Sequence, residues 1–444
     1  MEDLTTGPLT RHLLKTTGFM LVMMVFQTLY FLIDLYWVGR LGTDAIAGVA
    51  ISGNLTFVVL ALTQMLGIGT TAVMSHAVGR KDHEQAHLLF NQSQVLAMII
   101  GGLYLIVGLA LVVPYTNAMA ADAETARLAR SYLFWFVPAM ALQFLLVAIG
   151  AALRGTGNFK PGMLVSTGSV IVNMVLAPFL IFGWVTGHAF GVAGAAISSL
   201  ISIVFAIVWL AWYLKGDTYL RIDTSIWKPQ LAVWKRVLAI GFPTGFEFAM
   251  TALYMMLVYA TIRPFGATAQ AAFGVGGRVI QALFMPAVAL GFSVAPVAGQ
   301  NFGAGKPDRV KRTFQDGAYM VVGVMLLLAA ACHFAPHAFV RLFSNDPEVL
   351  SYATDYLRIV SWTFVPSGLI FVTSSMFQAM GNTMPSLISS GARMTLLAIP
   401  LLFMSRMAGF QMLWIWYLSV ATVVLQLGIS LSLLRREFSR KLLT

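Results

Sequence analysis

Long apolar runs separated by short polar stretches recur along the whole chain of 444 residues. Each run can supply the ~20 apolar residues that a helix needs to cross a bilayer. The pattern predicts an all-α, polytopic membrane protein with twelve transmembrane helices. They lie near residues 13–38, 45–75, 90–113, 129–150, 161–183, 191–214, 236–262, 268–302, 314–336, 354–378, 385–405 and 411–434. The second and eighth runs are longer than a bilayer requires, so we expect those helices to tilt or protrude.

The composition excludes a water-soluble fold. Apolar residues make up 59% of the chain and charged residues only 10%, against about 25% charged residues in an ordinary soluble domain. Twelve membrane helices leave no room for a large soluble domain. The single cysteine, Cys332, excludes an internal disulfide and any metal site built from several thiolates.

The net charge of +11 reports on membrane topology. If the N-terminus is inside, nineteen of the 28 Lys and Arg residues lie on the inner side and seven on the outer side. This bias predicts that both termini are cytoplasmic. The positive charge then contacts a lipid leaflet, so we expect no nucleic-acid partner. The polar start has no secretory signal pattern. We expect a monomeric, multi-pass protein of the plasma membrane, the inner membrane if the source is a bacterium.

The second half of the chain repeats the first at an offset of 224 residues. The matches include Gly42 with Gly266, Gly79 with Gly303, Gly157 with Gly381, and Pro161 with Pro385. Because each copy holds an even number of spans, both enter the membrane from the same side, as parallel repeats. We therefore expect an N-lobe over residues 1–214, a cytoplasmic loop over 215–235 and a C-lobe over 236–444, with a cleft between two six-helix lobes.

Two carboxylates, Asp34 and Glu247, lie well inside apolar runs. Placing a charged group there costs roughly 2.5–3.5 kcal/mol on insertion scales. Burial favours the neutral form of a carboxylate, so either acid could carry a proton. Neither has a counterpart in the other repeat. The alternative is a structural role, in which each acid is locked to a neighbouring arginine.

Other polar residues could support these acids. Gln27 and Tyr30 lie two turns and one turn before Asp34, on the same helix face. Arg278 is embedded in an apolar run, and its repeat partner is Asn54. Each of them could either hold helices together through hydrogen bonds or act directly in transport.

Two motifs suggest enzymes, but neither is complete. His83, Glu84 and His87 match the H-E-x-x-H pattern of zinc peptidases, yet no acid nearby can supply a third ligand. Gly303–Lys306 resembles a phosphate-binding loop, but Pro307 stands where Ser or Thr would bind magnesium. We therefore expect no enzymatic activity, no ATP-driven step and no metal cofactor.

Together these strings resemble the multidrug and toxic compound extrusion (MATE) family over nearly the full chain. The resemblance lies in residues 34–42 (DLYWVGRLG), 75–79 (SHAVG), 153–157 (LRGTG), 241–243 (GFP) and 299–305 (GQNFGAG). It implies two six-helix lobes that export lipophilic, often cationic drugs against an inward flow of H⁺ or Na⁺. It also implies that Asp34 is the coupling carboxylate of the N-lobe and that the protein contributes to antibiotic resistance.

Departures from the family pattern refine this expectation. Relatives that bind Na⁺ in the N-lobe tend to carry Asn followed four residues later by Asp, whereas this chain has Asn173 and Ala177. Asp34 is then the only N-lobe carboxylate, and proton coupling is favoured over Na⁺. Glu247 lies four residues after Pro243, a placement that resembles the bacterial DNA-damage-inducible branch. We assign Glu247 to the attraction of cationic substrates or to a second proton site. Relatives often carry a first-helix proline where this chain has Gly18-Phe19, so a proline kink there is not expected.

The sequence therefore predicts secondary active efflux of small-molecule drugs by alternating access, with no cofactor besides the coupling ion. The alternative is a flippase for lipid-linked glycans, which shares the two-lobe plan. Such a protein would line its cleft with several Arg or Lys residues to hold pyrophosphate. Only Arg278 and Arg393 are embedded well inside apolar runs here.

Overall fold

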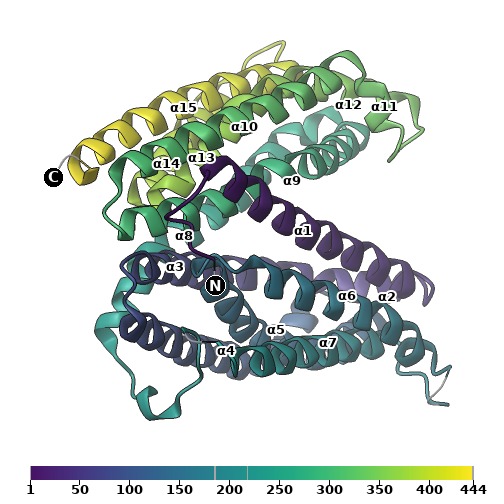
Figure 1. Ribbon diagram of the computed structural model, residues 1–444. Helices are drawn as coiled ribbons and strands as arrows, with labels where there is room; N and C mark the ends of the chain where they lie inside the picture. Colours follow the sequence, from purple (N-terminus) through teal and green to yellow (C-terminus); the bar gives the residue numbers. More distant parts are fainter. Residues whose placement is uncertain (1, 185–186, 218, 443–444) are drawn as a thin grey trace. The chain divides into compact units, whose positions relative to one another are not determined.

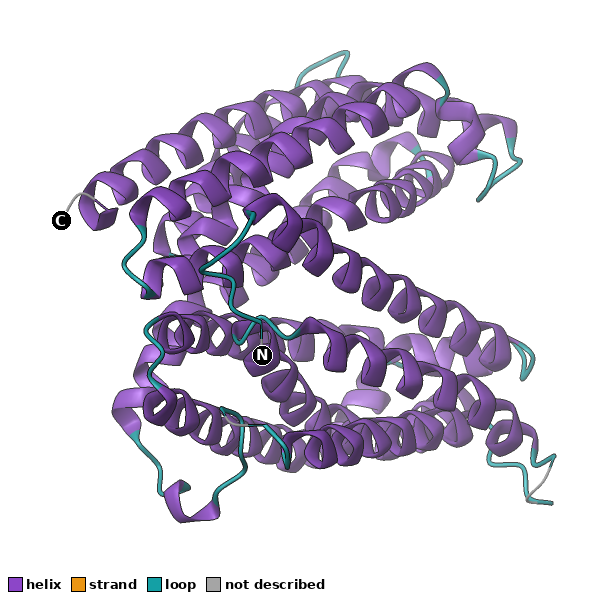
Figure 2. Cartoon of the chain, in the orientation of Figure 1, coloured by secondary structure: helices purple, strands orange, loops and turns teal. Residues whose placement is uncertain are grey.

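The computed structural model describes residues 2–184, 187–217 and 219–442, except for the side chain of Asn54. The described chain is helical and contains no β-strand (Figures 1 and 2). Its α-helices are α1 (Leu9–Gly39), α2 (Thr43–Ile51), α3 (Gly53–Gly79), α4 (His83–Met119), α5 (Ala123–Gly155), α6 (Phe159–Phe182), α7 (Val192–Leu214), α8 (Leu231–Ile262), α9 (Ala267–Gly303), α10 (Pro307–Phe334), α11 (Pro336–Val340), α12 (Pro347–Val360), α13 (Phe364–Ala379), α14 (Met384–Met404) and α15 (Met412–Leu442). The short 3-10 helices are η1 (Thr224–Ile226), η2 (Arg263–Phe265) and η3 (Ser361–Thr363).

Twelve helical segments in the described chain are long and apolar enough to cross a membrane, which confirms the predicted number. Two of them join two α-helices, and the seventh adds η2 to the end of α8. The second span joins α2 and α3 at Ser52, and the tenth joins α12 and α13 through η3. The apolar pattern did not predict these two breaks, because the hydropathy is continuous across them.

Helices also begin earlier than the apolar runs do. The H-E-x-x-H string, expected in a loop, forms the first turns of α4 instead. Asp82 causes this early start, because its side chain accepts a hydrogen bond of 2.9 Å from the backbone N–H of Gln85 and so caps the helix.

The backbone confirms the internal repeat. Gly42 and Gly266, 224 residues apart, both take positive φ angles of 111° and 94° just before a helix begins. Lys81, the one non-glycine residue with positive φ in the described chain, has φ 58°, and its repeat partner Gly305 has φ 64°. Equal turns at equal spacing show that the two halves share one local structure.

The chain divides into two compact units. The N-unit contains Phe19–Phe242, and the C-unit contains Leu4–Gly18 and the chain from Pro243 onward. One boundary falls inside α1 and the other inside α8, at positions exactly one repeat offset apart. The units and the predicted lobes therefore divide the chain at different residues, because each repeat's first helix begins in the opposite unit.

Burial and hydrogen bonds explain why the N-terminal segment belongs to the C-unit. Leu4, Leu9 and Leu13 are buried in the C-unit core. The backbone N–H of Leu4 donates to Gln300 Oε1 at 3.1 Å, and Asn301 Nδ2 donates to the Leu4 carbonyl at 3.0 Å. These contacts hold the start of α1 on the end of α9.

Charged side chains strengthen this attachment. Lys306 Nζ donates to the Thr5 carbonyl at 2.8 Å, and Arg309 donates from Nε to Asn301 Oδ1 at 2.8 Å. Lys306, the lysine of the incomplete phosphate-loop pattern, therefore binds backbone.

We predict that Asn301→Ala detaches this segment from the C-unit. Asn301 is fully buried, and its loss removes the amide donor to the Leu4 carbonyl and the acceptor of Arg309 Nε. The expected cost is about 1–3 kcal/mol of folding free energy, measured as a lower unfolding temperature in detergent. Gln315→Ala, an exposed change on α10, is the control. An unchanged unfolding temperature in Asn301→Ala would show that the segment is not held.

The loop between the repeats docks on the N-unit in a similar way. Asn91 on α4 donates to the Arg221 carbonyl at 2.9 Å and accepts from Trp227 Nε1 at 3.1 Å. Gln92 Nε2 donates to the Lys228 carbonyl at 2.8 Å. Hydrogen bonds from Ser225 lower the pKa of the half-buried Asp223, which caps η1. Each unit is therefore bound by the segment that leads into the other repeat's first helix.

Candidate functional site

Asp34 lies in the part of α1 that belongs to the N-unit. Its Oδ1 atom is buried, and no hydrogen-bond partner for that atom exists among the described residues. A buried carboxylate oxygen without a donor is strongly disfavoured as an anion, because nothing replaces the lost water. Either a proton or a bound cation would satisfy it.

A hydrogen-bonded chain passes beside Asp34 through three helices of the N-unit. The Tyr30 hydroxyl, one turn before Asp34 on α1, lies 2.6 Å from Ser199 Oγ on α7. Asn173 Nδ2 on α6 donates to Ser199 Oγ at 3.3 Å and to Ser198 Oγ at 3.1 Å. The structure thus connects Tyr30 and Asn173, two residues that sequence analysis had singled out separately.

Tyr132 on α5 completes the surroundings of the acid. It is buried, and the charge of Asp34 acts on the Tyr132 and Tyr30 hydroxyls alike. Sequence analysis did not select Tyr132, and it missed Ser198 and Ser199. The serine pair inside an otherwise apolar run was the available signal, because embedded hydroxyls usually bind across helices.

Two other predicted residues do not join this group. The side chain of Gln27 is exposed, and within the described chain no hydrogen bond links it to Asp34. Asn54 is helical within α3, but its side chain lies outside the described part of the structure. Ala177, one turn after Asn173, is fully buried among apolar residues and leaves no second carboxylate at that place.

Glu247 lies on α8 within the C-unit, in a second polar group. Its Oε1 atom is also buried and lacks a partner among the residues described. The hydroxyls of Ser386 and Ser390 on α14 face the carboxyl. Ser386 lies 2.8 Å from Ser374 Oγ, and Gln426 Nε2 donates weakly to Ser390 at 3.4 Å. This group offers oxygen atoms on four helices.

An arginine and an aromatic ring lie two turns further along the same faces. Arg393 packs over the ring of Tyr254, with 5.4 Å from the guanidinium carbon to the ring centroid. Its Nε atom is buried without an acceptor in the described chain. Arg278, in contrast, is exposed on α9.

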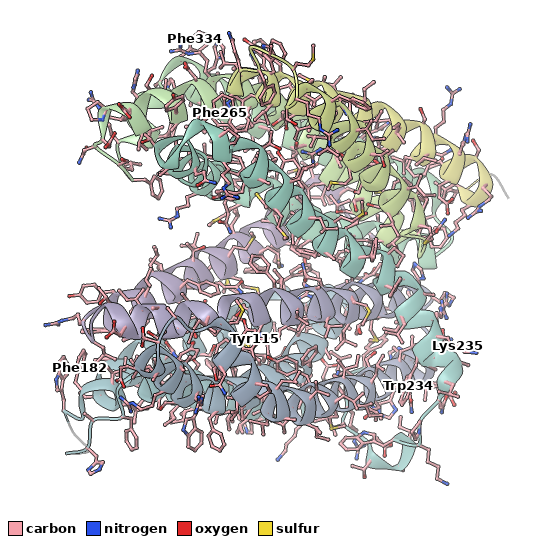
Figure 3. The ribbon with its side chains drawn as sticks, turned by 180° about the vertical axis from the view of Figure 1, so that it is seen from behind. Tyr115, Phe182, Trp234, Lys235, Phe265 and Phe334 are labelled. Atoms are coloured by element: carbon pink, nitrogen blue, oxygen red, sulfur yellow. The ribbon has the colours of Figure 1, made fainter. Side chains whose placement is uncertain are left out.

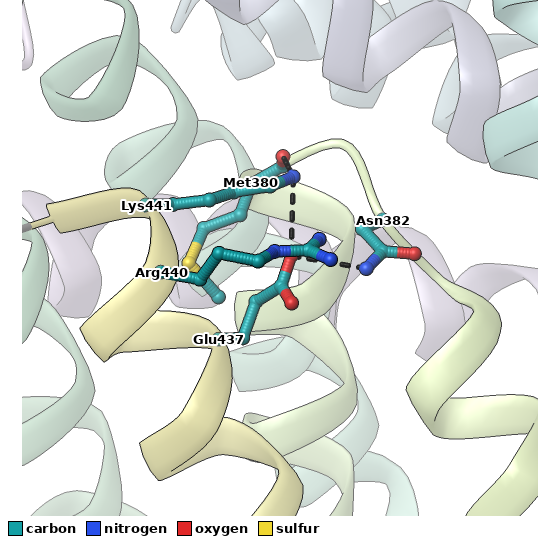
Figure 4. Close-up of polar contacts among 5 residues, drawn as sticks. All are labelled: Met380, Asn382, Glu437, Arg440 and Lys441. Carbon is teal, nitrogen blue, oxygen red and sulfur yellow. Dashed lines mark hydrogen bonds and ion pairs between the residues drawn. The ribbon is translucent and has the colours of Figure 1, made fainter. Parts of the chain in front are cut away.

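Glu437 shows what a structural carboxylate looks like in this fold. It is buried near the end of α15, yet it accepts from Asn382 Nδ2 at 3.0 Å and pairs with Arg440 at 3.0 Å and Lys441 at 3.1 Å (Figure 4). Lys441 also donates to the Met380 carbonyl at 2.7 Å. Asp34 and Glu247 lack such partners, which distinguishes them as candidates for a functional role.

We predict that Glu437→Ala lowers stability and leaves ion coupling unchanged. The substitution leaves the half-buried Asn382 amide without its acceptor and removes the ion pairs to Arg440 and Lys441, at a cost of about 1–3 kcal/mol. Thermal unfolding in detergent should reveal this loss. Vesicles that contain equal amounts of folded protein should keep the native dependence of transport on pH. A shifted pH dependence would show that Glu437 belongs to the coupling site.

The arrangement fits ion exchange better than bond chemistry. The described residues contain no group of three or more His, Cys, Asp or Glu side chains that could hold a metal ion. His83 of the H-E-x-x-H string stacks on Tyr219, with ring centroids 3.9 Å apart. That contact occupies the first histidine of the pattern with an aromatic ring.

Comparisons with known proteins agree with this geometry. A profile of the MatE family matches residues 20–179 and 243–404. The chain is 26% identical over 403 residues to an FAD transporter of Shewanella oneidensis, covering 90% of this chain and 89% of that protein. It is 27% identical over 375 residues to the probable multidrug resistance protein YoeA of Bacillus subtilis, covering 82% and 80%. An outward-facing multidrug resistance MATE transporter superposes with a TM-score of 0.91 at 22% identity, covering 99% of this chain and 98% of the other.

These matches define a multi-pass membrane transporter. The chain belongs to the MatE family of multidrug and toxic compound extrusion transporters. Members of this family are transporters, which agrees with the expectation that the protein is not an enzyme. The assignment to the DNA-damage-inducible branch stays a prediction.

Proposed function

We propose that this MATE transporter exports lipophilic, often cationic organic compounds in exchange for protons, with Asp34 as the coupling carboxylate. The observation that carries the proposal is the buried Oδ1 atom of Asp34, which has no donor within the described chain. A proton satisfies such an oxygen directly, whereas Na⁺ prefers several oxygen ligands. Ala177 removes the second carboxylate that would favour Na⁺.

Protonation would couple to movement through the neighbouring hydrogen bonds. A charged Asp34 attracts a cationic compound, and a neutral Asp34 releases it. The same change alters the field at Tyr30, whose bond to Ser199 joins α1 to α7. We propose that this rearrangement drives alternating access. For an uncharged compound, each proton moved through ~100 mV supplies roughly 2.3 kcal/mol, enough for a gradient of nearly fifty-fold. One-for-one exchange of a proton for a monovalent cation moves no net charge, so the pH difference alone drives it, with about 1.4 kcal/mol or a tenfold gradient per pH unit.

Glu247 supports the recognition of cationic substrates in this scheme. Its unpartnered oxygen and the facing serine hydroxyls form an acidic, hydrogen-bonding group. The alternative assignment of Glu247 is a second site that binds and releases a proton. Arg278 and Arg393 do not form the cluster of basic side chains that a flippase for pyrophosphate-linked lipids would need, so no observation here favours that function.

The coupling ion can be tested in reconstituted vesicles. We expect an imposed pH gradient to drive ethidium export without Na⁺, and a Na⁺ gradient at equal pH to drive none. Transport that requires Na⁺ and ignores pH would contradict proton coupling. A parallel assay with FAD, the compound named for the Shewanella oneidensis relative, tests the other substrate class. Because the site described here is acidic, we expect ethidium to be exported and FAD not.

A further inference from the structure

A charged groove lies in the C-unit, and it contains neither Asp34 nor Glu247. It has a volume of about 360 Å³ and is formed by the short helix α11 and one face of α12. The charged lining residues are Arg341, Asp355 and Arg358, with His337 beside them. On α12 the lining positions recur every three or four residues from Pro347 to Arg358, so the groove follows about three turns of the helix.

The position of Arg358 along its span places it near the membrane boundary. The tenth span runs over 33 residues from Pro347 to Ala379, whereas a bilayer core needs only about 20. About 20 residues counted back from Ala379 reach a position close to Arg358. The first turns of α12, with Arg341 opposite them, then protrude into water.

Exposed aromatic side chains near Arg358 support its placement at the membrane boundary. Phe334 is 84% exposed and Trp362 is 65% exposed (Figure 3 labels Phe334). His333 contacts both rings, at centroid distances of 5.3 Å and 5.5 Å, and its Nδ1 lies 3.2 Å from the Arg358 carbonyl. Exposed aromatic rings next to an arginine are typical of a membrane interface.

The charges in the groove are not neutralised by one another. Arg358 and Asp355 lie three residues apart on α12, about 4.5 Å along the helix axis. Both side chains are exposed, yet no ion pair joins Asp355 to Arg358 or to Arg341 in the described structure. The groove therefore presents a cation at the membrane boundary and an anion one turn farther out.

We propose that this groove binds the headgroup of a phosphatidylethanolamine lipid. Arg358 holds the lipid phosphate, since a guanidinium matches phosphate oxygens in charge and geometry. The ammonium group, one turn farther from the membrane, donates to Asp355. The acyl chains lie below, against the exposed rings of Phe334 and Trp362. A choline headgroup has no N–H to donate to Asp355, and a glycerol headgroup has no positive charge.

The test uses native mass spectrometry to measure which lipids stay bound to the purified full-length protein in detergent. We expect phosphatidylethanolamine to be retained in preference to phosphatidylcholine and phosphatidylglycerol. Arg358→Ala should weaken its binding about tenfold, the loss of one charged hydrogen-bond partner. Arg358→Lys should restore part of it. Asp355→Asn should reduce the preference for ethanolamine over choline, because the amide oxygen can accept a hydrogen bond but carries no charge. Glu348→Gln, an exposed change on α12 outside the groove lining, should leave the preference intact.

Other results would overturn the proposal. Unchanged retention of phosphatidylethanolamine in Arg358→Ala, or an intact preference in Asp355→Asn, would show that the headgroup does not lie here. O-phosphoethanolamine and inorganic phosphate at millimolar concentration separate a lipid site from a site for soluble anions. Displacement of the lipid by inorganic phosphate, which has no ammonium group, would identify a soluble anion as the ligand, whereas weak competition by O-phosphoethanolamine is expected of a headgroup site. Unfolding temperatures of all variants check that each is folded, and no transport measurement is needed.

Discussion

Asp34→Asn is expected to reduce ethidium export driven by a pH gradient to the level of protein-free vesicles. The amide keeps the size of the side chain but has no charge to attract the cation and cannot exchange a proton. Asp44→Asn, which alters an exposed acid at the start of α2, should transport normally. The assay is ethidium fluorescence in vesicles with equal amounts of inserted protein.

An exchange measurement separates lost coupling from lost folding. Vesicles loaded with an unlabelled, uncharged lipophilic substrate should still exchange it for the external labelled compound in Asp34→Asn, because this exchange needs neither the charge of Asp34 nor a net movement of protons. Tyr30→Phe, which removes the hydroxyl that contacts Ser199, should slow export and keep its dependence on pH. Coupled export by Asp34→Asn at the native rate would refute the role of this carboxylate.

Glu247→Gln is expected to weaken ethidium binding about tenfold or more at a pH where the native carboxylate is ionised. The change removes a negative charge in a poorly hydrated position, and a charged hydrogen-bond partner contributes about 1.5–3 kcal/mol. Binding of an uncharged lipophilic compound should not change. Equilibrium binding to purified protein measures both affinities.

The control is Glu348→Gln, which removes an exposed acid from the first turn of α12. It should bind both compounds as the native protein does. If Glu247→Gln bound ethidium normally but lost part of the pH dependence of transport, Glu247 would be a second proton site, and its assignment to substrate attraction would be wrong.

The twelve helices could be predicted because a bilayer imposes a length and an apolar surface on every span. The repeat could be predicted because special turns need the same residues in both copies, as at Gly42 and Gly266. The breaks at Ser52 and in η3 could not, since helix packing and not hydropathy determines them. The attachment of Leu4 to the C-unit could not be predicted either, because it depends on contacts between residues almost 300 positions apart in sequence.

The candidate site shows the same division. An embedded acid is conspicuous in a sequence, so Asp34 and Glu247 could be selected from hydropathy alone. Their surroundings could not be, because Ser199 reaches Tyr30 only after α1 and α7 pack together. Glu437 was overlooked because it follows the last apolar run, although the fold buries it.

The central claim is that substrate and proton compete at Asp34. The most direct test adds ethidium to purified protein in weakly buffered detergent and follows a soluble pH indicator. The account predicts that the native protein releases protons in proportion to the ethidium bound and that Asp34→Asn binds ethidium poorly and releases none. Proton release of native size from Asp34→Asn, or ethidium binding by the native protein without any release, would contradict it.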